Sequence, residues 1–173
     1  MTHPDASEER AETAVEAVEV DAELLAFSTL EDIHHGDAHL LFTDYSGDYS
    51  AEQWARIILE NVPGETRIAL ERAWQIIALR LRAVGTAHTV AGWPIAHVDP
   101  EYVLLHTASD FGFEGQLLFR RNENSVLLAT FVRFHDPAAR AVWDRALPAH
   151  LGFVRTLLAA SADRLADTSA ANH

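Results

Sequence analysis

The chain has 173 residues, of which 49% are hydrophobic and 23% are charged, and its formal net charge is -13. This length suits one globular domain with a sizeable core. Cysteine and lysine are both absent, which excludes disulfides, thiolate metal sites, cysteine nucleophiles and lysine Schiff bases.

The acidic charge is concentrated at the N-terminus. Residues 1–23 hold eight acids against one Arg, a net charge of -7, whereas the remaining residues hold 18 acids and 12 Arg, a net charge of -6. Because this segment lacks aromatic residues and strong apolar runs, we expect an acidic, disordered tail. A peripheral helix is the alternative, since Ala11, Val15 and Val18 recur at helical spacing. Neither form suits nucleic acid, which requires clustered cations.

The sequence predicts no membrane span and no export. Its longest apolar stretches fall far short of the about 20 residues that a transmembrane helix requires. The N-terminus is acidic and rich in alanine, where a secretory signal has a basic start and an apolar centre. We therefore expect a cytoplasmic protein.

The first predicted elements are one strand and two helices. A short apolar segment bounded by polar residues predicts a strand over 39–43. Ser50 and Gln53 form a capping box that begins a helix over 51–62. A second helix is predicted over 66–84. Its apolar stripe consists of Leu70, Trp74, Ile77, Leu81 and Val84.

The second half of the chain predicts a sheet followed by one long helix. Four β-rich runs are separated by turn-forming residues and predict an antiparallel meander over 90–98, 102–108, 113–120 and 125–134. The last run is apolar on both faces, so we expect a central strand covered by a helix on one side and by a tail or partner on the other. Asp136 is the predicted N-cap of a helix that extends to about residue 165, is interrupted by Pro148 and frays over 167–173.

These elements predict an α+β fold with one domain over residues 24–166. In it, a curved antiparallel sheet wraps around the long C-terminal helix to bury the apolar face of that helix. Two shorter helices lie between the first and second strands.

Three short segments are distinctive: Gly92-Trp93-Pro94-Ile95, Ala129-Thr130-Phe131-Val132-Arg133-Phe134-His135, and Trp143 followed by Pro148-Ala149-His150. With these segments, the order of elements resembles the START-like superfamily, also called SRPBCC or helix-grip. More narrowly, residues 37–166, about three quarters of the chain, are similar to an uncharacterised bacterial domain family in or near that superfamily. The resemblance implies a ligand cavity between a bent sheet and the C-terminal helix.

The first predicted hairpin contains candidate ligand-binding residues. Antiparallel pairing of its strands puts Trp93 on the same face as Tyr102, Leu104 and His106. If that face is concave, His106 and Tyr102 place polar groups in an otherwise apolar hollow, which is typical of a small-molecule pocket. If that face is outside, they are solvated side chains. Alternation alone leaves both interpretations open.

Other candidates come from later strands and from the last helix. His150 lies on the apolar stripe of that helix, where it is either a hydrogen-bonded core residue or a donor or general acid for a ligand. Arg133 either meets solvent at the rim of the sheet or pairs with a buried acid or a ligand carboxylate. The remaining candidate ligand-binding residues are Phe113, Leu117, Phe131 and Trp143.

A cluster of histidines raises the question of a metal site. On an extended segment, His35, Asp37 and His39 share one face, which permits metal ligation. Gly36 favours a turn at this position, however, so we expect a polar loop and no metal. The sequence also contains no dinucleotide-binding loop or other cofactor motif.

Three functions follow as hypotheses. The first is non-enzymatic carriage or sensing of a small apolar or amphipathic molecule in the cavity. The second, which some superfamily relatives exemplify, is an acid–base enzyme for a polyketide-like or other carbonyl substrate, in which His106 or His150 transfers the proton and Arg133 or Tyr102 stabilises an enolate. The third is an interaction module, in which the acidic segment binds a basic partner or two copies pair at an exposed sheet edge. An enclosed space of several hundred Å³ beside His150 would favour the first two.

Overall fold

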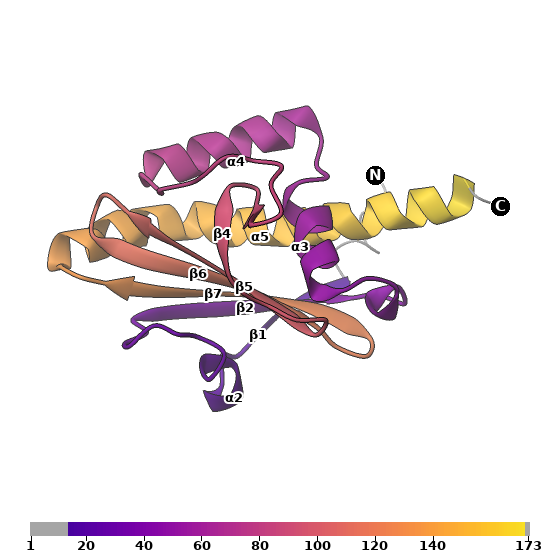
Figure 1. The fold of residues 1–173 in the computed structure, drawn as a ribbon, viewed down its shortest axis with the longest axis horizontal. Helices are drawn as coiled ribbons and strands as arrows, with labels where there is room; N and C mark the ends of the chain where they lie inside the picture. The colour runs from indigo at the N-terminus through magenta and orange to yellow at the C-terminus, as the bar shows by residue number, and fades with distance from the viewer. Residues whose placement is uncertain (1–13, 172–173) are drawn as a thin grey trace, which may run out of the picture.

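The computed structural model describes residues 14–171, which form one antiparallel sheet with helices on both of its faces (Figure 1). The seven strands are ordered β1-β2-β7-β6-β5-β4-β3. The strands are β1 (Val15–Val18), β2 (His35–Phe42), β3 (Thr89–Val90), β4 (Trp93–Val98), β5 (Tyr102–Ser109), β6 (Phe113–Arg121) and β7 (Ser125–Phe134). The helices are α2 (Ala22–Leu25), the 3-10 turn η1 (Ser46–Asp48), α3 (Ala51–Leu59), α4 (Gly64–Ile76) and α5 (Pro137–Ala171).

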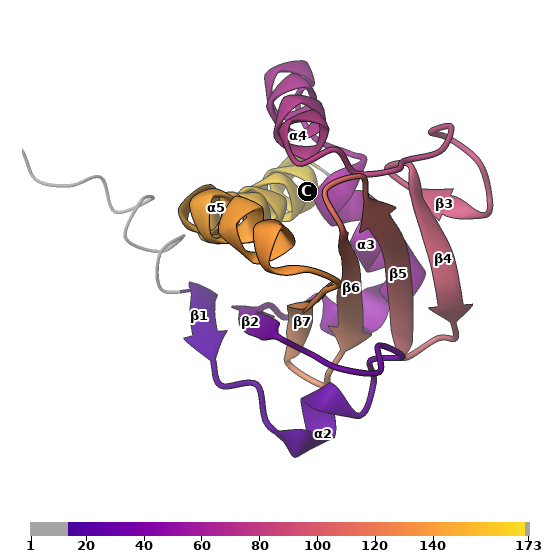
Figure 2. The ribbon, with the colours of Figure 1, turned by 90° about the vertical axis from the view of Figure 1, so that its left-hand side faces the viewer.

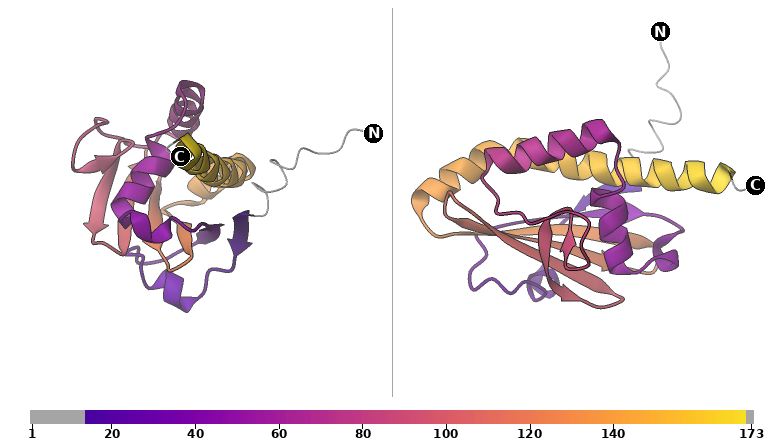
Figure 3. Two further views of the ribbon diagram at one scale, coloured as in Figure 1. Left: turned by 90° about the vertical axis from the view of Figure 1, so that its right-hand side faces the viewer. Right: turned by 45° about the horizontal axis from the view of Figure 1, so that its top comes forward.

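The sheet is curved, and three helices lie on its concave side. Figure 2 shows α3, α4 and α5 on that side and α2 on the opposite side. Figure 3 shows α5 extending along the length of the sheet, as expected for a long C-terminal helix gripped by a curved sheet. Within the described residues, none of the helices combines the length and apolar character that crossing a membrane would need.

Local sequence signals place the ends of two helices. Ser50 and Gln53 form the expected capping box of α3, with the Ser50 side chain accepting from the Gln53 amide and the Gln53 side chain accepting from the Ser50 amide. Asp136 caps α5, since its carboxylate accepts from the Ala139 amide at 2.9 Å. Both predictions are therefore confirmed.

Alternation along the strands creates buried apolar clusters on both faces of the sheet. On the concave face, Leu117 and Leu128 belong to a core that also includes the fully buried Trp54 of α3. On the opposite face, Leu118 and Phe131 belong to a second core, against which side chains of residues 18–33 pack. The prediction that β7 is central and covered on both sides is confirmed, and the cover on the outer face is a segment of this chain.

The prediction of a disordered acidic tail over residues 1–23 is wrong for the part of this segment that the structure describes. Residues 15–18 form the edge strand β1, which pairs antiparallel with β2 from Val15↔Leu41 to Val18↔Ala38. Val15 is buried in the concave core, and this apolar contact outweighs the acidic composition of the segment. The part of the expected tail over residues 1–13 lies outside the described residues. Strand β1 precedes the strand that was expected to be first. Helices α3 and α4 therefore lie between β2 and β3, and not between the first two strands of the chain as predicted.

The predicted ends of two helices also need correction. The second helix was expected to reach residue 84, but α4 ends at Ile76. Ala78 adopts a φ of 52°, and Leu79 then forms a bridge with Ser109 beside β5, so pairing with the sheet replaces the last helical turns. Fraying was expected from residue 167, whereas α5 continues to Ala171.

The turn before Trp93 requires a glycine at position 92, and a substitution can test this requirement. Gly92 adopts a φ of +86°, and a Cβ at this position would lie 2.9 Å from the backbone oxygen of Arg82. We expect Gly92→Ala to lower the free energy of unfolding by about 1–3 kcal/mol, because the left-handed conformation and the contact both oppose a side chain. Urea unfolding followed by circular dichroism measures the change.

The matched control is Gly47→Ala. A Cβ there would meet no atom within 4 Å, so the stability should stay within about 0.5 kcal/mol of the wild type. Equal stabilities of the two variants would contradict the strain assigned to Gly92.

Candidate functional site

A cavity of about 520 Å³ lies between the concave face of the sheet and helices α4 and α5. Its floor comes from alternate residues of the two central strands, because only every second side chain of a strand points to this face. The floor residues are Phe113, Gly115 and Leu117 of β6 and Leu128, Thr130 and Val132 of β7. The cavity has the expected position and size, with His150 in its wall, but it is partly open to solvent and not enclosed.

Small side chains keep this space open. Gly115 contributes no side chain to the floor, and a Cβ there would only reach ordinary contact, 3.7 Å, with the Trp93 ring. Helix α4 presents Ala69 and Ala73 to the cavity, and α5 presents Ala146 and Ala149. Since well-packed interiors leave few voids larger than a water molecule, a hollow of this size reflects the choice of small residues on facing elements.

Four aromatic rings pack in two pairs around the cavity. Trp74 of α4 contacts Trp93 of β4 edge to face, with ring centroids 6.1 Å apart. Trp143 of α5 packs in the same manner on Phe113, with centroids 6.0 Å apart. These rigid side chains connect the helices to the sheet around the open space, so the wall is preformed.

Three residues of the wall have a buried polar atom without a hydrogen-bond partner. The atoms are Trp93 Nε1, Thr130 Oγ1 and Trp143 Nε1. A buried donor that lacks a partner costs about 1–3 kcal/mol. The wall of the cavity therefore holds more hydrogen-bonding capacity than the described residues satisfy.

Beside the cavity, Asp37 of β2 lies between two histidines. His35 Nε2 donates to Asp37 Oδ2 at 2.8 Å, and His150 Nε2 of α5 donates to the same oxygen at 3.0 Å. The Trp143 ring packs against both imidazoles, with centroid distances of 5.2 Å to His35 and 5.1 Å to His150. Because His150 also lines the cavity, this group of residues connects the cavity to a buried carboxylate.

The surroundings of Asp37 strongly favour its charged form. Burial by itself raises the pKa of Asp37, but the hydrogen bonds and positive charges of His150 and His35 outweigh burial and lower this pKa from 3.8 to about 2. His39 lies on the same face, with Nδ1 3.8 Å from Asp37 Oδ1 and no partner for that nitrogen. Burial lowers the pKa of His39, and the nearby Asp37 opposes this shift only in part.

The three candidate metal ligands thus lie on a strand and not in the polar loop that was expected. His35, Asp37 and His39 share the concave face of β2, opposite Val132, Thr130 and Leu128 of β7. Gly36 continues the strand, because its neighbours pair with β7 on both sides. Over residues 14–171, no group of three or more His, Asp or Glu side chains has an arrangement that could hold a metal ion.

Five of the nine predicted ligand-binding residues line the cavity. They are Trp93, Phe113, Leu117, Trp143 and His150. The other four, Tyr102, Leu104, His106 and Phe131, do not line it, and their placement in the cavity is wrong.

A β-bulge explains most of this error. Ile95 pairs with Leu105, but His97 pairs with Leu104, so the register shifts between Ile95 and His97. Trp93 therefore faces the cavity, whereas His97 stacks on Tyr102 on the opposite face, with centroids 4.3 Å apart. The sequence-based prediction assumed uniform alternation along β4 and so placed Trp93 on the same face as Tyr102, Leu104 and His106.

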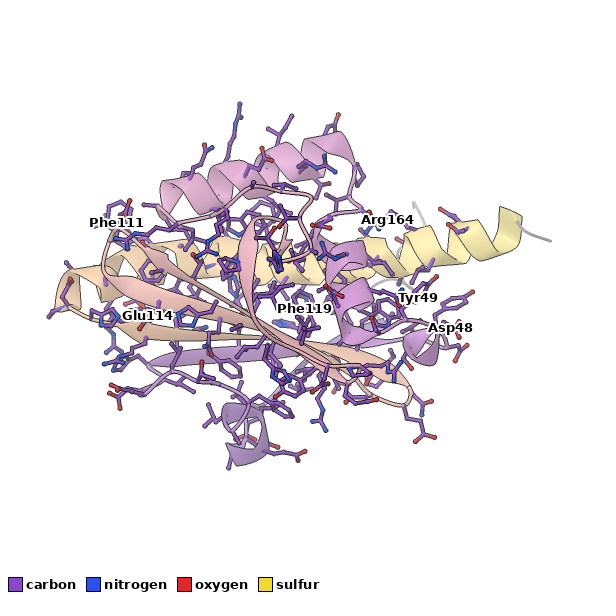
Figure 4. The ribbon with its side chains drawn as sticks, in the orientation of Figure 1. Asp48, Tyr49, Phe111, Glu114, Phe119 and Arg164 are labelled. Carbon is purple, nitrogen blue, oxygen red and sulfur yellow. The ribbon has the colours of Figure 1, made fainter. Side chains whose placement is uncertain are left out.

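The candidate catalytic residues are divided between the two faces. His106 Nε2 donates to Glu114 at 3.1 Å on the outer face, where His135 donates to the same carboxylate at 2.9 Å. Figure 4 places Glu114 toward the end of the sheet that is farther from α3. Arg133 forms an ion pair at 3.1 Å with the exposed Glu31, which agrees with the alternative at the rim and not with a buried acid. Of the three candidates, only His150 borders the cavity.

Sequence reasoning did not identify the contributions of α4 and Thr130. The α4 stripe of Leu70, Trp74 and Ile77 was recognised as apolar, and all three residues line the cavity. The signal that could have identified the hollow is the pair of alanines at positions 69 and 73, which lie on the face of α4 that packs toward the sheet. Thr130, a lone polar residue in an apolar strand, was a second signal.

Comparison with known proteins leaves the site to be argued from its own geometry. No model of a known protein family matches the sequence, and no significant match is found among curated proteins.

The charge of Asp37 gives a prediction about acid stability. Because its pKa in the fold is about 2 and its ordinary value is 3.8, the stabilisation from its ionised form is complete above the ordinary value and is lost as the pH falls toward 2. The contribution should be about 2 kcal/mol, since the side chain is only 12% exposed. Asp37→Asn should lack this part of the acid dependence in urea unfolding at pH values between about 2 and 6.

The control for this prediction is Asp44→Asn, which changes an exposed carboxylate in the loop after β2. It should retain the acid dependence of the wild type. Parallel pH profiles for the wild type and Asp37→Asn would contradict the role given to Asp37.

Proposed function

We propose that the protein binds or carries a small hydrophobic or amphipathic molecule in the cavity between the sheet and helices α4 and α5. The observation that carries this proposal is the cavity of about 520 Å³ with a largely apolar wall. Ligand pockets typically have volumes of about 300–1,000 Å³, apolar linings and a few polar groups that orient the guest.

The polar atoms of the wall suggest what else the guest contains. Trp93 Nε1, Thr130 Oγ1 and Trp143 Nε1 can each donate a hydrogen bond and have no partner among the described residues. A carbonyl, ether or hydroxyl oxygen on the guest would give such a donor a partner after a small side-chain adjustment. An apolar molecule that contains one or two oxygen acceptors therefore fits better than a pure hydrocarbon.

We also propose that the fold is of the helix-grip, START-like type. The support is a curved sheet of antiparallel strands with a long C-terminal helix on its concave side. The position of the cavity between this sheet and this helix matches what the sequence resemblance implies.

A second candidate function is acid–base catalysis in the same cavity. It is favoured by one observation, the hydrogen bond of 3.0 Å between His150 Nε2 and Asp37 Oδ2 at the cavity wall. A carboxylate that holds an imidazole in one tautomer leaves Nδ1, the other ring nitrogen, able to accept a proton from a substrate. The pairing of His150 with His106 or Arg133 is not part of this candidate, because those residues lie on the other face.

The carriage proposal is tested by filling the cavity. Gly115→Val adds methyl groups to the floor, where the Cβ meets only the Trp93 ring at 3.7 Å. We expect the fold to persist and binding of an uncharged apolar dye, N-phenyl-1-naphthylamine, to weaken by about tenfold or more, because the guest and the new side chain would occupy the same space. Dye fluorescence measures the affinity, and native mass spectrometry of gently purified protein reports a copurified guest.

The matched control is Gly36→Val, which adds the same side chain to a strand glycine on the outer face. Its Cβ would make ordinary contacts, 3.5 Å to Val20 and 3.8 Å to Phe131. It should bind the dye as the wild type does. Equal binding by Gly115→Val and the wild type, together with a bare mass, would overturn the proposal.

The catalytic candidate is tested by isotope exchange at a carbon next to a carbonyl. In deuterium oxide, the wild type should accelerate the exchange of cyclohexanone, and His150→Gln and Asp37→Asn should each reduce the acceleration by about tenfold or more, since the pair acts as one base. Proton NMR of the ketone follows the exchange. His88→Gln, an exposed control before β3, should match the wild type; no acceleration by the wild type would count against this candidate.

A further inference from the structure

Two arginines border the apolar cavity. Arg72 of α4 and Arg145 of α5 both line it, and both are exposed to solvent. They therefore lie where the cavity wall meets solvent, on the two helices that cover it. A guest that extends out of the apolar interior would reach these guanidinium groups.

Neither arginine has a partner within the described chain. No hydrogen bond or ion pair of either guanidinium occurs among residues 14–171, although seven other arginines there donate hydrogen bonds. The sequence gives the reason, because neither Arg72 nor Arg145 has an acid three or four positions away on its helix. Their hydrogen-bonding capacity remains available for a ligand.

The charge of the cavity wall is opposite to that of the whole protein. The chain has 26 acids and 13 basic residues, all of which are Arg. Within the described residues, the wall contains both of these arginines and no Asp or Glu. The charged side chains that line the cavity are therefore both cations, which favours an anion there, although Glu71 and Asp144 are their sequence neighbours.

We propose that Arg72 and Arg145 bind the carboxylate of an acidic apolar molecule whose hydrocarbon part fills the cavity. This inference rests on the proposed binding of an amphipathic molecule and specifies its chemical class. A guanidinium offers paired donors that match a carboxylate, and it keeps its charge at every physiological pH.

The part of the cavity wall beside His150 is unsuitable for the carboxylate. Asp37 lies behind His150 with a neighbouring oxygen, Oδ1, that has no hydrogen-bond partner. A second carboxylate beside it would add like-charge repulsion in a poorly solvated place. The acid group of the guest therefore lies toward the arginines, and its apolar part lies between Leu117, Leu128 and Leu157.

The experiment compares two ligands that share a chain and differ in the head group, decanoic acid and decan-1-ol. Trp74, Trp93 and Trp143 line the cavity, so intrinsic tryptophan fluorescence reports binding of both. We expect the wild type to bind decanoate about tenfold more tightly than decanol at low salt, a ratio typical of one charge-assisted hydrogen-bonded pair. Added salt should reduce this preference, since the arginines are exposed.

Substitution assigns the preference to particular residues. Arg72→Gln and Arg145→Gln should each reduce the affinity for decanoate severalfold and leave that for decanol unchanged, and the double variant should bind the two ligands equally. Arg140→Gln, an exposed arginine of α5 that does not line the cavity, should behave as the wild type.

The outcomes separate this inference from the function on which it rests. Equal affinities of the wild type for decanoate and decanol, or an undiminished preference in the double variant, overturn the role of the arginines and leave the apolar cavity as a binding site. Failure of the wild type to bind either ligand overturns both proposals.

Discussion

The cavity depends on small residues in its lining, which are Ala69 and Ala73 of α4, Ala146 and Ala149 of α5, and Gly115 of β6. None of these residues has a side chain that extends beyond a Cβ atom. The large rings Trp93 and Trp143 lie at the sides, where they hold the layers in place. Dispersion forces strongly favour closing such a void, so it persists only because the surrounding elements are fixed elsewhere. The α3 end of the sheet supplies that support, since Trp54, Ile58 and Phe119 are fully buried there, and Figure 4 places Phe119 near α3.

Beside the cavity, the buried carboxylate of Asp37 determines how α5 lies on the sheet. Asp37 accepts hydrogen bonds from His35 on its own strand and from His150, which is 113 positions away in the sequence. A buried carboxylate is costly without partners, so this pair of contacts selects the rotation of α5 that directs His150 toward β2. The same rotation presents Trp143, two turns earlier, to His35 and Phe113. The electrostatic requirement of one carboxylate thereby also places the aromatic wall of the cavity.

Sequence reasoning succeeded where the signal is local and failed where tertiary contacts decide. The capping box at Ser50 and the N-cap Asp136 depend on residues three positions apart, and the antiparallel meander follows from short turns between apolar runs. The bulge between Ile95 and His97 has no comparable signature, yet it reverses which face the later residues occupy. Strand β1 was missed for the same reason, because its four residues are stabilised by pairing with β2 and by burial of Val15, and not by their own composition.

The polar side chains on the outer face of the sheet bind one another and the chain segment that covers them. His106, Glu114 and His135 are engaged with one another there, and Gln116 accepts from Ser28 Oγ at 2.7 Å and donates to Thr29 Oγ1 at 2.6 Å. These bonds attach the segment between α2 and β2 to the sheet. This segment covers the outer apolar face of β7. Because Gln116 is fully buried, its hydrogen bonds are needed to avoid an unpaired polar group, and the residues that satisfy them are unavailable to a ligand on the concave side. The two faces therefore differ: polar groups of the outer face are paired with one another, whereas Trp93, Thr130 and Trp143 on the inner face each have a buried polar atom with no partner among the described residues.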